Sequence, residues 1–481
     1  MTPPRFAPEE LAAATGGRWL GPRSCAVAGL STDSRSVAEG NAFVALRGER
    51  FDAHDFLAEV AAAGAACAVV SADWVARALA ENRALPGIPL LAVGDTLAAL
   101  GAVAHLHRAR FHVPLVAVTG SNGKTSTREM VGAILRARGP ALKTEGNLNN
   151  EVGLPLTLLG LEATHWAGVV EMGMNHAGEI GRLCAVAEPQ IGVVTNAGPA
   201  HLEHLGSVDA VADAKAELYR GLPPGGIAVA NADDPRMLER ARSSGRRLVT
   251  FARGRGRPGD VVALEVLEHG PEGLRFLLAV GSRELEVRLP LVGLHNCANA
   301  AAAAAAAVAL GCSDREILQG LSAVRPVGRR LRLERLASGV TLLDDCYNAN
   351  PSSMSAALAT LAELAARGGG RPLAVLGDML ELGAAGEEAH RALGAEAARV
   401  VAALGAFGPL SRHLAEGARA AGLPAADLHQ GEDVAALSAW VRRRLAPGDV
   451  LLVKGSRGMR LERVVEALRE APADASPGAS A

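Results

Sequence analysis

Residues 115–138 place a strand pattern, a glycine-containing loop and a helix pattern in direct succession. The apolar run Leu115–Val118 predicts a buried strand, and Ser126–Arg138 predicts a helix. The loop between them, Thr119–Thr125, reads Thr-Gly-Ser-Asn-Gly-Lys-Thr. Glycines allow a phosphate group to approach the backbone, and the N-terminus of a helix supplies N–H donors and a favourable dipole. The segment therefore predicts an α/β fold with a phosphate-binding loop at one end of a sheet strand.

This loop is shorter than the usual P-loop motif. The usual motif has a further glycine two positions before Gly120, where this chain has Val118. We expect Lys124 to reach the β- and γ-phosphates of a nucleotide and the Thr125 hydroxyl to bind Mg²⁺. A tight turn without chemistry is the alternative, and the flanking strand and helix favour nucleotide binding. The residues predicted to contact the nucleotide are Thr119, Gly120, Ser121, Asn122, Gly123, Lys124 and Thr125.

Strand and helix patterns alternate through most of the chain. Continuous Val- and Ile-rich strand runs separated by helices predict a mostly parallel sheet that is covered on both faces. Residues 250–290 differ, since apolar and charged residues alternate there, and they predict a small antiparallel patch. The alanine-rich run Ala300–Leu310 predicts a tightly packed helix. The predicted strands are Ala42–Leu46, Ala66–Val70, Leu115–Val118, Gly168–Glu171, Ile191–Thr195, Gly226–Ala230, Thr341–Leu343, Leu373–Leu376, Val400–Leu404 and Val450–Val453.

The chain is predicted to form three α/β domains. Residues 1–95 would form a small N-terminal α/β domain, and residues 96–325 a central P-loop-type domain with a mostly parallel sheet. Residues 326–470 repeat the α/β pattern and predict a Rossmann-like C-terminal domain, because Arg and Pro interrupt the pattern near Val324–Gly328. The Ala/Pro/Ser-rich residues 471–481 are predicted to be a disordered tail.

Composition excludes several functional classes. Of the 481 residues, 49% are apolar and 21% charged, which is typical of soluble globular proteins. A net charge of −2 and only 3% aromatic residues argue against a nucleic-acid or anionic-membrane surface. No apolar run is long enough to span a bilayer, and the N-terminus has no signal core. The six scattered cysteines, among them Cys25, predict reduced, mostly buried thiols in a cytoplasmic protein.

Three polar residues downstream of the loop are candidates for the same site. Glu171 ends a predicted strand and His201 follows another, so both would lie at the carboxyl edge of the sheet, where ligands bind. Glu171 is a candidate Mg²⁺ ligand there, with a helix-capping role as the alternative. His201 is equally compatible with a structural role. Lys215 lies on a predicted helix, where an ordinary surface lysine is the alternative.

Polar turns also follow two predicted strands of the C-terminal domain. Asp345, Tyr347 and Asn348 are candidates for contacts with a nucleotide's base and ribose, and an Asx-turn before a helix is the alternative. The run Lys454–Arg457, Lys-Gly-Ser-Arg, suits an anionic group such as a substrate carboxylate, and plain solvated charges are the alternative. Nearer the N-terminus, the amides of Asn147–Asn150 suit a sugar, peptide or phosphate, or simply a turn.

Further runs extend this pattern over nearly the whole chain. In order, the matching runs are Ser31–Arg35, Ala45–Phe56, Thr119–Thr125, Gly146–Asn150, Glu171–His176, His201–Glu203, Ala214–Glu217, Leu294–Ala300, Asp344–Pro351, Leu376–Met379 and Lys454–Arg457. Each run alone is weak, but their order is specific. The sequence resembles the Mur ligases of peptidoglycan synthesis.

The resemblance implies a first domain that holds a UDP-sugar precursor, a second that carries ATP, and a third that closes over both. It implies ATP and Mg²⁺ as cofactors, with one Mg²⁺ each on Glu171 and His201. In some sister ligases the lysine that matches Lys215 is carbamylated and helps to hold the second Mg²⁺, and whether Lys215 is modified in this chain stays open. Nucleotide contacts are implied for Asn299, Asp345, Asn348 and Arg330, with Arg329 as the alternative to Arg330. Substrate contacts are implied for Thr32, Ser34, Arg35, Arg47, Gly48, His54, Asn149, Asn150, Lys454, Ser456 and Arg457.

The implied reaction is ATP-dependent amide ligation through an acyl phosphate. The run Asp345–Pro351 lacks the DNPR-type turn of the tripeptide-making branch, which favours the dipeptide-adding branch. The implied partners are UDP-N-acetylmuramoyl-tripeptide and D-alanyl-D-alanine, used by a monomer. The third residue of the tripeptide stays open. Rival interpretations are a folylpolyglutamate-synthase-like or other Mur amide ligase, and a nucleotide switch that ligates nothing.

Overall fold

The computed structural model describes residues 3–21, 26–48, 51–254 and 259–470. The predicted disordered tail 471–481 and Cys25 lie outside the described residues. The chain forms two compact units. The predicted domain boundaries near residues 95 and 325 stay a prediction. The first unit comprises Met1–Ala117, Gly139–Met174 and Glu179–Gln190, and the second comprises Val118–Arg138, Asn175–Gly178 and Ile191–Ala481.

The first unit opens with a five-stranded sheet in the order β2-β7-β6-β5-β4. Strands β4 to β7 are parallel, and β2 pairs antiparallel with β7. The apolar runs predicted as strands thus form buried sheet strands, and the apolar side chains of helices α2 and α3 pack against them. The elements are α1 (Pro8–Thr15), β2 (Arg18–Leu20), β4 (Leu30–Ser31), β5 (Ala42–Val44), α2 (Leu57–Ala62), β6 (Cys67–Ser71), α3 (Ala72–Ala80) and β7 (Leu90–Val93), with the small pair β1 (Arg5–Phe6) and β3 (Val27–Ala28).

The rest of the first unit is built around a second set of parallel strands. Strand β10 (Ala167–Glu171) pairs with β9 (Ala141–Lys143) in parallel. On its other side, Gly168 N–H donates to the carbonyl of Pro114 (3.0 Å), directly before β8 (Leu115–Thr119). Helix α4 (Thr96–Arg108), which begins at the Asp95 cap, packs on α6 (Gly153–Leu158) and α7 (Glu179–Ala187). This arrangement places Glu171 at the carboxyl end of its strand, as predicted.

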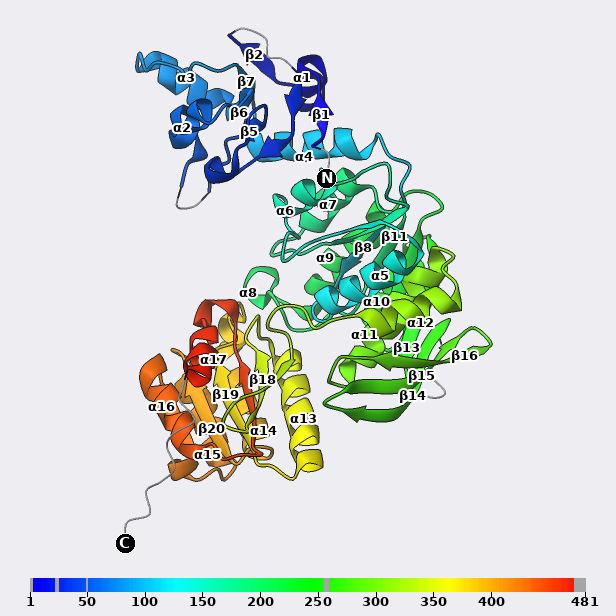
Figure 1. Ribbon diagram of the computed structural model, residues 1–481, viewed down its shortest axis with the longest axis vertical. Coiled ribbons are helices and arrows are strands. Elements are labelled where there is room, and N and C mark those ends of the chain that lie inside the picture. Colours follow the sequence, from blue (N-terminus) through cyan, green and yellow to red (C-terminus); the bar gives the residue numbers. More distant parts are fainter. Residues whose placement is uncertain (1–2, 22–25, 49–50, 255–258, 471–481) are drawn as a thin grey trace. The chain divides into compact units, whose positions relative to one another are not determined.

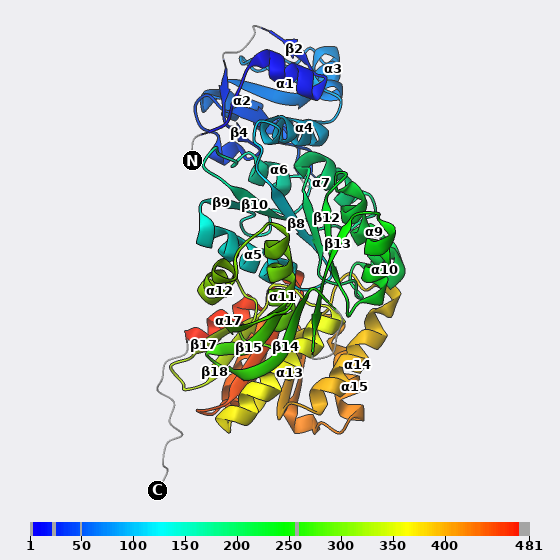
Figure 2. The same cartoon turned by 90° about the vertical axis from the view of Figure 1, so that its right-hand side faces the viewer.

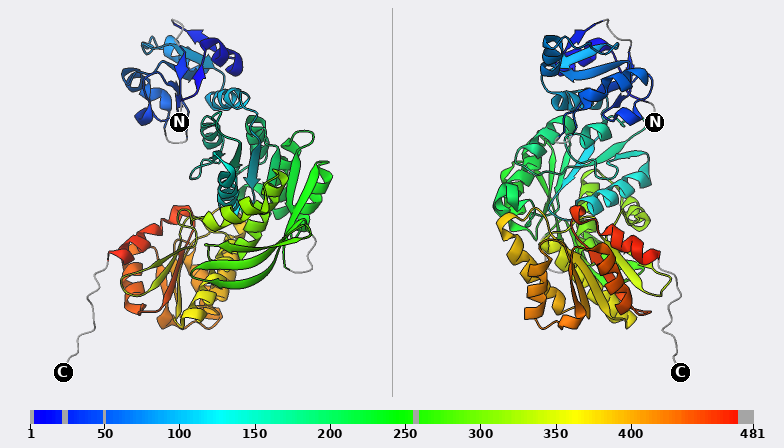
Figure 3. Two further views of the ribbon diagram at one scale, coloured as in Figure 1. Left: turned by 45° about the vertical axis from the view of Figure 1, so that its right-hand side comes forward. Right: turned by 90° about the vertical axis from the view of Figure 1, so that its left-hand side faces the viewer.

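The last residues of β8 and six further strands of the second unit form a mixed sheet. Strands β11 (Ile191–Val194), β12 (Ile227–Asn231), β13 (Arg247–Arg253) and β14 (Val261–Gly270) pair in parallel. Strands β15 (Gly273–Val280) and β16 (Arg283–Leu289) then add as an antiparallel ribbon, whose long strands are visible in green in Figure 3. The antiparallel patch predicted within residues 250–290 is therefore confirmed.

An alanine-rich helix forms the centre of this packing. Helix α11 (His295–Ala309) lies against β13 and β14 and against α5 (Lys124–Arg138) (Figure 2). Every residue from Ala300 to Ala307 is fully buried, because small side chains let the helix approach its neighbours closely on all sides. The predicted tightly packed helix is confirmed. Three further helices of this unit are α9 (Val208–Gly221), α10 (Pro235–Ser243) and α12 (Asp314–Ala323).

The second unit also contains a six-stranded sheet in the order β17-β18-β22-β19-β20-β21. All its pairs are parallel except the edge pair β17–β18. Helices α13, α14 and α15 cover one face, and α16 and α17 cover the other (Figure 1). The α/β class with helices on both faces is confirmed. The bounds are β17 (Arg332–Arg335), β18 (Thr341–Asp345), α13 (Pro351–Gly368), β19 (Pro372–Gly377), α14 (Gly386–Ala398), β20 (Ala403–Phe407), α15 (Ser411–Ala420), β21 (Leu428–Gly431), α16 (Val434–Arg444), β22 (Val450–Lys454) and α17 (Glu462–Arg469).

One predicted strand is displaced along the sequence. The expected strand Val400–Leu404 lies at Ala403–Phe407, because the N–H groups of Val400 and Val401 both donate to the carbonyl of Ala397 and close the turn that ends α14. Apolar residues in a buried turn carry the same pattern as a strand. Strand β21 is missed because it is a half-exposed edge strand with the polar sequence Leu-His-Gln-Gly.

The cysteines in the described ranges are buried and form no disulfide. Burial raises the pKa of the Cys67 thiol to about 12 and that of Cys297 to about 11, so both stay protonated near neutral pH. The prediction of reduced, buried thiols is confirmed for the five cysteines that the structure describes. None of the helices in the described ranges combines the length and the apolar character needed to cross a membrane.

Candidate functional site

The predicted phosphate loop connects β8 to α5, which begins at Lys124. The Lys124 ammonium folds back over the loop and donates to the carbonyls of Gly120 (2.7 Å) and Ser121 (3.3 Å). Thr125, in the first turn of α5, is buried. The buried hydroxyl of Thr119 has no hydrogen-bond partner among the described residues. The loop therefore gathers one cation, a helix N-terminus and two hydroxyl groups, which are the groups that a nucleotide's phosphates require.

Both glycines of the loop are required by their surroundings. Gly120 has a φ of +149° and Gly123 a φ of +81°, which non-glycine residues rarely adopt. A Cβ atom on Gly120 would lie 1.8 Å from Oγ1 of Thr195, and one on Gly123 would lie 2.2 Å from Oδ1 of Asn299. The Asn299 amide thus lies directly against the loop. Its implied contact with the adenine side stays a prediction.

A network of hydrogen bonds from neighbouring polar side chains holds the phosphate loop in place. Asn122 N–H donates to Oδ1 of Asn196 (3.0 Å), and the Thr195 hydroxyl donates to the carbonyl of Asn122 (2.6 Å). Asn350, which caps α13, donates from Nδ2 to Oδ1 of Asn122 (2.8 Å). The sequence analysis did not single out Thr195, Asn196 or Asn350. Their signal was available, since two directly follow a strand and one directly precedes a helix.

Lys215 is fully buried within α9. Its side chain is 1% exposed, and no residue that the structure describes forms an ion pair or hydrogen bond with its Nζ atom. Burial, and then the charge of Lys124, lowers the pKa of Lys215 well below its usual value. The alternative of an ordinary surface lysine is therefore wrong. Burial therefore disfavours the charged form of this amine.

The imidazole of His201 contacts the carboxylate of a residue that the sequence analysis did not select. Its Nδ1 atom lies 2.7 Å from Oε2 of Glu381. Both residues have left-handed backbone conformations, with φ of +56° and +63° respectively. His201 directly precedes the short helix α8 (Leu202–Leu205), and Glu381 follows the quoted run Leu376–Met379 by two residues. Only the sequence proximity to that run hinted at Glu381.

The polar turns of the C-terminal sheet contact one another. Lys454 Nζ lies 2.7 Å from Oδ2 of Asp345 and donates to the carbonyl of Asn348 (2.9 Å). Ser456 accepts a hydrogen bond from Leu380 N–H (2.9 Å). The side chain of Arg457 is 66% exposed. The Lys454 ammonium thus contacts other residues of the protein, whereas the Arg457 guanidinium is accessible to solvent.

The two candidate arginines before this sheet differ in their partners. Arg329 pairs with Glu466 (2.8 Å) and Asp344 (3.6 Å). The guanidinium of Arg330 stacks 4.0 Å from the ring centre of Tyr347, in the turn that carries the predicted nucleotide contacts. This difference favours Arg330 as the nucleotide-contacting arginine, which stays a prediction.

In the first unit, Glu171 ends β10 and is almost completely buried. Its Oε1 accepts a hydrogen bond from Nδ2 of Asn149 (2.8 Å). Asn150 instead accepts from Gly153 N–H (2.9 Å) at the start of α6, so its side chain shapes the turn. Asn149 therefore orients the candidate Mg²⁺ ligand, and neither amide has a shown contact with substrate.

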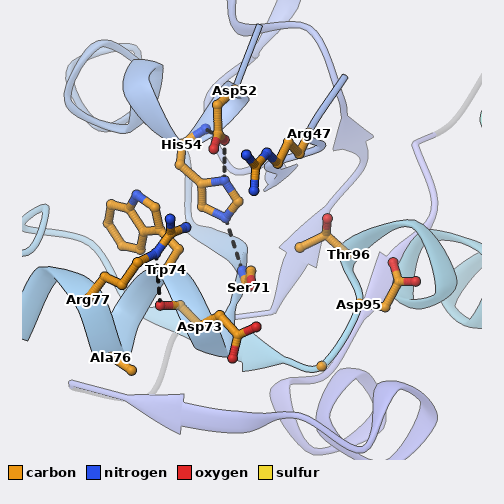
Figure 4. Close-up of a pocket in the computed structure, with 11 residues that line it drawn as sticks. Arg47, Asp52, His54, Ser71, Asp73, Trp74, Ala76, Arg77, Asp95 and Thr96 are labelled. Atoms are coloured by element: carbon orange, nitrogen blue, oxygen red, sulfur yellow. Dashed lines mark hydrogen bonds and ion pairs between the residues drawn. The ribbon is translucent and has the colours of Figure 1, made fainter. Parts of the chain in front are cut away.

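A pocket of about 630 Å³ opens in the N-terminal part of the first unit (Figure 4). Its lining includes the predicted substrate residues Arg47 and His54, and also Trp74 and Arg77 of α3. The buried His54 ring stacks on Trp74 with centroids 5.2 Å apart, and its Nδ1 lies 2.5 Å from the carboxylate of Asp52. The lining therefore combines two guanidinium groups and a stacked aromatic pair with the carboxylates of Asp52, Asp73 and Asp95.

The other predicted residues of this domain lie elsewhere. Thr32, Ser34, Arg35 and Gly48 are not part of the described pocket lining. Arg35 is exposed, and its guanidinium lies 2.7 Å from the carboxylate of Asp33. That guanidinium holds the pKa of Asp33 down to about 2. The run Ser31–Arg35 is thus shaped by local contacts in the described structure.

The candidate magnesium ligands have donor chemistry that fits the ion. The Thr125 hydroxyl and the Glu171 carboxylate are hard oxygen donors, and both are buried. Within the described ranges, no group of three or more His, Cys, Asp or Glu residues could hold a metal by itself. Mg²⁺ typically takes one or two side chains and completes its shell with substrate phosphates and water, so a sparse donor set fits it.

Comparison with known proteins matches three families along the chain. These are the Mur ligase family catalytic domain (residues 26–139), the Mur ligase middle domain (118–307) and the Mur ligase glutamate ligase domain (329–457). UDP-N-acetylmuramoyl-tripeptide–D-alanyl-D-alanine ligase of Escherichia coli is 40% identical over 448 residues, covering 92% of this chain and 93% of that protein. The Bacillus subtilis ligase of the same name is 36% identical, with the same coverage.

Solved structures agree with these relatives. A crystal structure of MurF from Acinetobacter baumannii has a TM-score of 0.87 at 34% identity, covering 98% of this chain and 100% of that one. MurF ligase from Thermotoga maritima in complex with ADP has a TM-score of 0.79 at 28% identity, covering 92% and 97%. Folylpolyglutamate synthase of Mycobacterium tuberculosis, at 18% identity and a TM-score of 0.60, shares the fold. The chain therefore belongs to the Mur ligase family.

Proposed function

We propose that this protein joins D-alanyl-D-alanine to the terminal carboxylate of UDP-N-acetylmuramoyl-tripeptide, with ATP converted to ADP and phosphate. The observation that carries the proposal is the loop at the start of α5, where Gly120 and Gly123 leave no room for a Cβ and Lys124 covers the backbone. The names of relatives at 36–40% identity support the two substrates. The ADP complex of the Thermotoga maritima ligase supports the nucleotide.

The proposed chemistry has two steps. A carboxylate oxygen of the tripeptide attacks the γ-phosphorus of ATP, the bond to the β-phosphate oxygen breaks, and ADP leaves. The amine nitrogen of D-alanyl-D-alanine then attacks the carbonyl of the acyl phosphate, and phosphate and a proton are released. Lys124 would offset the charge on the phosphoryl oxygens. No side chain needs to act as a covalent nucleophile, so positioning and electrostatics supply most of the rate.

Glu171 and His201 would each hold one Mg²⁺, with the Thr125 hydroxyl as a further ligand, as the family resemblance implies. When bound, the ions neutralise negative charge on the phosphates. The partnerless Lys215 supports a further proposal, that its neutral amine adds to CO₂, loses a proton and becomes a carbamate. That reaction turns a buried neutral amine into an anion that suits a site for cations. A carbamate carbon signal with isotope-labelled bicarbonate, absent in Lys215→Met, would test this step.

The pocket of Figure 4 is proposed to take the UDP part of the precursor. Arg47 and Arg77 would bind the diphosphate, and the His54–Trp74 pair would form a wall beside the nucleoside. Asn149, Ser456 and Arg457 stay candidates for the peptide portions. The dissociation constant of UDP alone, measured with an Arg47→Ala variant, checks this assignment without ATP.

The deciding experiment measures phosphate release from ATP together with product mass. Release is expected only when UDP-N-acetylmuramoyl-tripeptide and D-alanyl-D-alanine are both present, and the product should carry two added alanines. If phosphate is released at the same rate when either substrate is omitted, the ligase assignment is refuted. A folate with glutamate as the substrate pair is expected to give no turnover. Parallel assays with diaminopimelate or lysine at the third peptide position would identify the natural tripeptide.

We also propose that the enzyme works as a monomer in the cytoplasm. Both the nucleotide-linked precursor and ATP are found there, and none of the proposed contacts needs a second copy of the chain. Light scattering coupled to size-exclusion chromatography is expected to give a mass close to the 49.3 kDa of one chain. A stable dimer at micromolar concentration would contradict the monomer.

A further inference from the structure

Two strained residues from distant parts of the sequence meet in the second unit. Six non-glycine residues in the described ranges have positive φ, and two of them, His201 and Glu381, are in direct contact. A left-handed backbone is unfavourable for a residue with a Cβ, so it persists where surrounding contacts enforce it. Such strain is concentrated at functional sites. The contact joins Nδ1 of the imidazole to a carboxylate oxygen at 2.7 Å.

Backbone contacts fix the two segments against each other. The N–H of Glu203, in α8, donates to the carbonyl of Glu381 (3.3 Å). A Cβ atom on Gly383 would lie only 3.2 Å from Cα of Glu203, so the chains approach closely there. The imidazole is mostly covered, with 18% of the His201 side chain exposed. The ion pair is therefore part of a built contact between α8 and the loop after β19.

Hydrogen bonds from its backbone also hold the loop that carries Glu381 in place. Met379 N–H donates to Nε2 of the buried His390 (3.0 Å), and Leu380 N–H donates to the hydroxyl of Ser456 (2.9 Å). Ser456 N–H in turn donates to the carbonyl of Asp378 (3.0 Å). An isolated surface ion pair would contribute little and would need no such support. Here, consecutive backbone groups are held so that the Glu381 side chain reaches the histidine.

We propose that Glu381 is a positioning residue for His201. Its carboxylate lies 2.7 Å from Nδ1, and we infer that it holds the ring and favours the tautomer that carries its proton on Nδ1 and leaves Nε2 unprotonated. A carboxylate in this role is the usual partner of a metal-binding histidine, because it sets the tautomer and makes the ring a better ligand. The inference rests on the proposed function in one respect, namely that His201 takes part in binding a divalent cation.

The first test reads the tautomer and does not depend on turnover. NMR of protein with isotope-labelled histidine is expected to show a ring protonated on Nδ1 that is absent in His201→Asn, in addition to the rings of His54 and His390, whose Nε2 atoms accept backbone N–H groups. In Glu381→Ala this signal should shift towards the Nε2-protonated tautomer that predominates in free histidine. Glu381→Gln, which keeps an oxygen acceptor, should retain the wild-type tautomer. An unchanged signal in Glu381→Ala would overturn the proposal.

The second test measures binding of Mn²⁺ in the presence of ADP. Loss of a residue that orients a metal ligand weakens metal affinity by about 10- to 100-fold, and Glu381→Ala is expected to fall in this range. Glu203→Ala is the matched control, since it removes a neighbouring exposed carboxylate that has no contact with His201, and its affinity should stay within about twofold of wild type. Melting temperatures show that each variant is folded.

The outcomes separate the inference from the function on which it rests. If His201→Asn weakens Mn²⁺ binding and Glu381→Ala does not, the positioning role is overturned while the metal role stands. If His201→Asn leaves Mn²⁺ binding unchanged, the proposed metal role of His201 fails. A double variant that is no weaker than His201→Asn alone supports the proposal, because Glu381 would then act only through the histidine.

Discussion

The ammonium of Lys454 lies 2.7 Å from a carboxylate oxygen of Asp345, at the ends of two neighbouring parallel strands. The two residues are register partners of β22 and β18, so the sheet itself brings them together. Lys454 also donates to the carbonyl of Asn348. Asp345 and Asn348 are the predicted nucleotide contacts of this turn. Lys454 holds both of them in position, so its ammonium already has partners within the protein.

Lys454→Met is expected to destabilise the protein strongly. It would leave the Asp345 carboxylate buried without its counter-charge, which typically costs about 3–5 kcal/mol. Urea denaturation followed by circular dichroism measures the change. Arg457→Met, in the same turn but 66% exposed, is the control and should change stability by no more than about 0.5 kcal/mol. Wild-type stability of Lys454→Met with lost substrate affinity would instead indicate direct substrate binding.

Gly123→Ala is expected to abolish nucleotide binding. The added Cβ would lie 2.2 Å from Asn299, in a backbone conformation that alanine rarely adopts, so the loop must move. We expect the ATP dissociation constant, measured by calorimetry, to rise at least about 100-fold, as for loss of several charged hydrogen bonds. Gly198→Ala is the matched control, because its nearest neighbour would be 3.7 Å away. Similar ATP affinity in both variants would contradict the assigned loop geometry.

Lys124→Ala is expected to lose turnover and keep its fold. The ammonium is only part-buried and its described hydrogen bonds go to two backbone carbonyls of the loop, so we expect its removal to leave the packed core intact. Removing one preorganised charge of this kind typically lowers kcat by about 10²- to 10³-fold. Steady-state kinetics and a melting curve measure the two effects, with Lys143→Ala as the control lysine. An active Lys124→Ala enzyme would rule out this loop as the phosphate site.

Arg77→Ala tests the N-terminal pocket. Loss of a charged hydrogen bond to a diphosphate should raise the KM for the UDP-linked precursor by about 10- to 100-fold, while the KM for ATP stays unchanged. Arg83→Ala is the matched control, because that arginine is exposed, lies beyond the same helix and pairs only with Glu81 among the described residues. Equal effects on both KM values would show that the pocket is not a separate substrate site.

The sequence predicted those parts of the site that are continuous along the chain. The strand, glycine loop and helix around Lys124 form one segment, and Glu171 ends a strand whose apolar pattern is clear. In contrast, Glu381 reaches His201 from another strand's loop, and Asn350 reaches Asn122 from the N-terminus of α13. Such contacts depend on tertiary packing, and no local periodicity marks them.

Burial was the second property that local patterns could not supply. A lysine at a helical position is usually exposed, and only the packed structure shows that Lys215 is not. The same holds for the pocket. Nothing in the sequence around Trp74 marks it as a pocket residue, and only the structure shows that its ring stacks on His54. Arg329 and Arg330 were indistinguishable as neighbours, and their different partners separate them.

A last prediction concerns acid stability and the helix that begins with the phosphate loop. Arg138, near the end of α5, donates two hydrogen bonds of 2.8 Å to Glu316 of α12, which also closes a capping box with Ser313. The hydrogen bond from Arg138 is the main reason that the pKa of Glu316 is lowered from 4.5 to about 2. Since the folded pKa is below the unfolded one, the unfolded chain binds more protons between these values. This contribution to stability is therefore complete above about pH 4.5 and is lost as the pH falls towards 2.

Glu316→Gln removes the titrating group and most of the charge-assisted bonding. We expect it to lower stability by about 1 kcal/mol at neutral pH, as for loss of a helix cap, and by progressively less as the pH falls. Urea midpoints measured from about pH 6 to about pH 3 should therefore converge for the variant and the wild type. Glu284→Gln, which removes an exposed carboxylate, should instead follow the wild-type curve throughout. Parallel curves for Glu316→Gln and wild type would show that the Arg138–Glu316 contact does not couple the two helices.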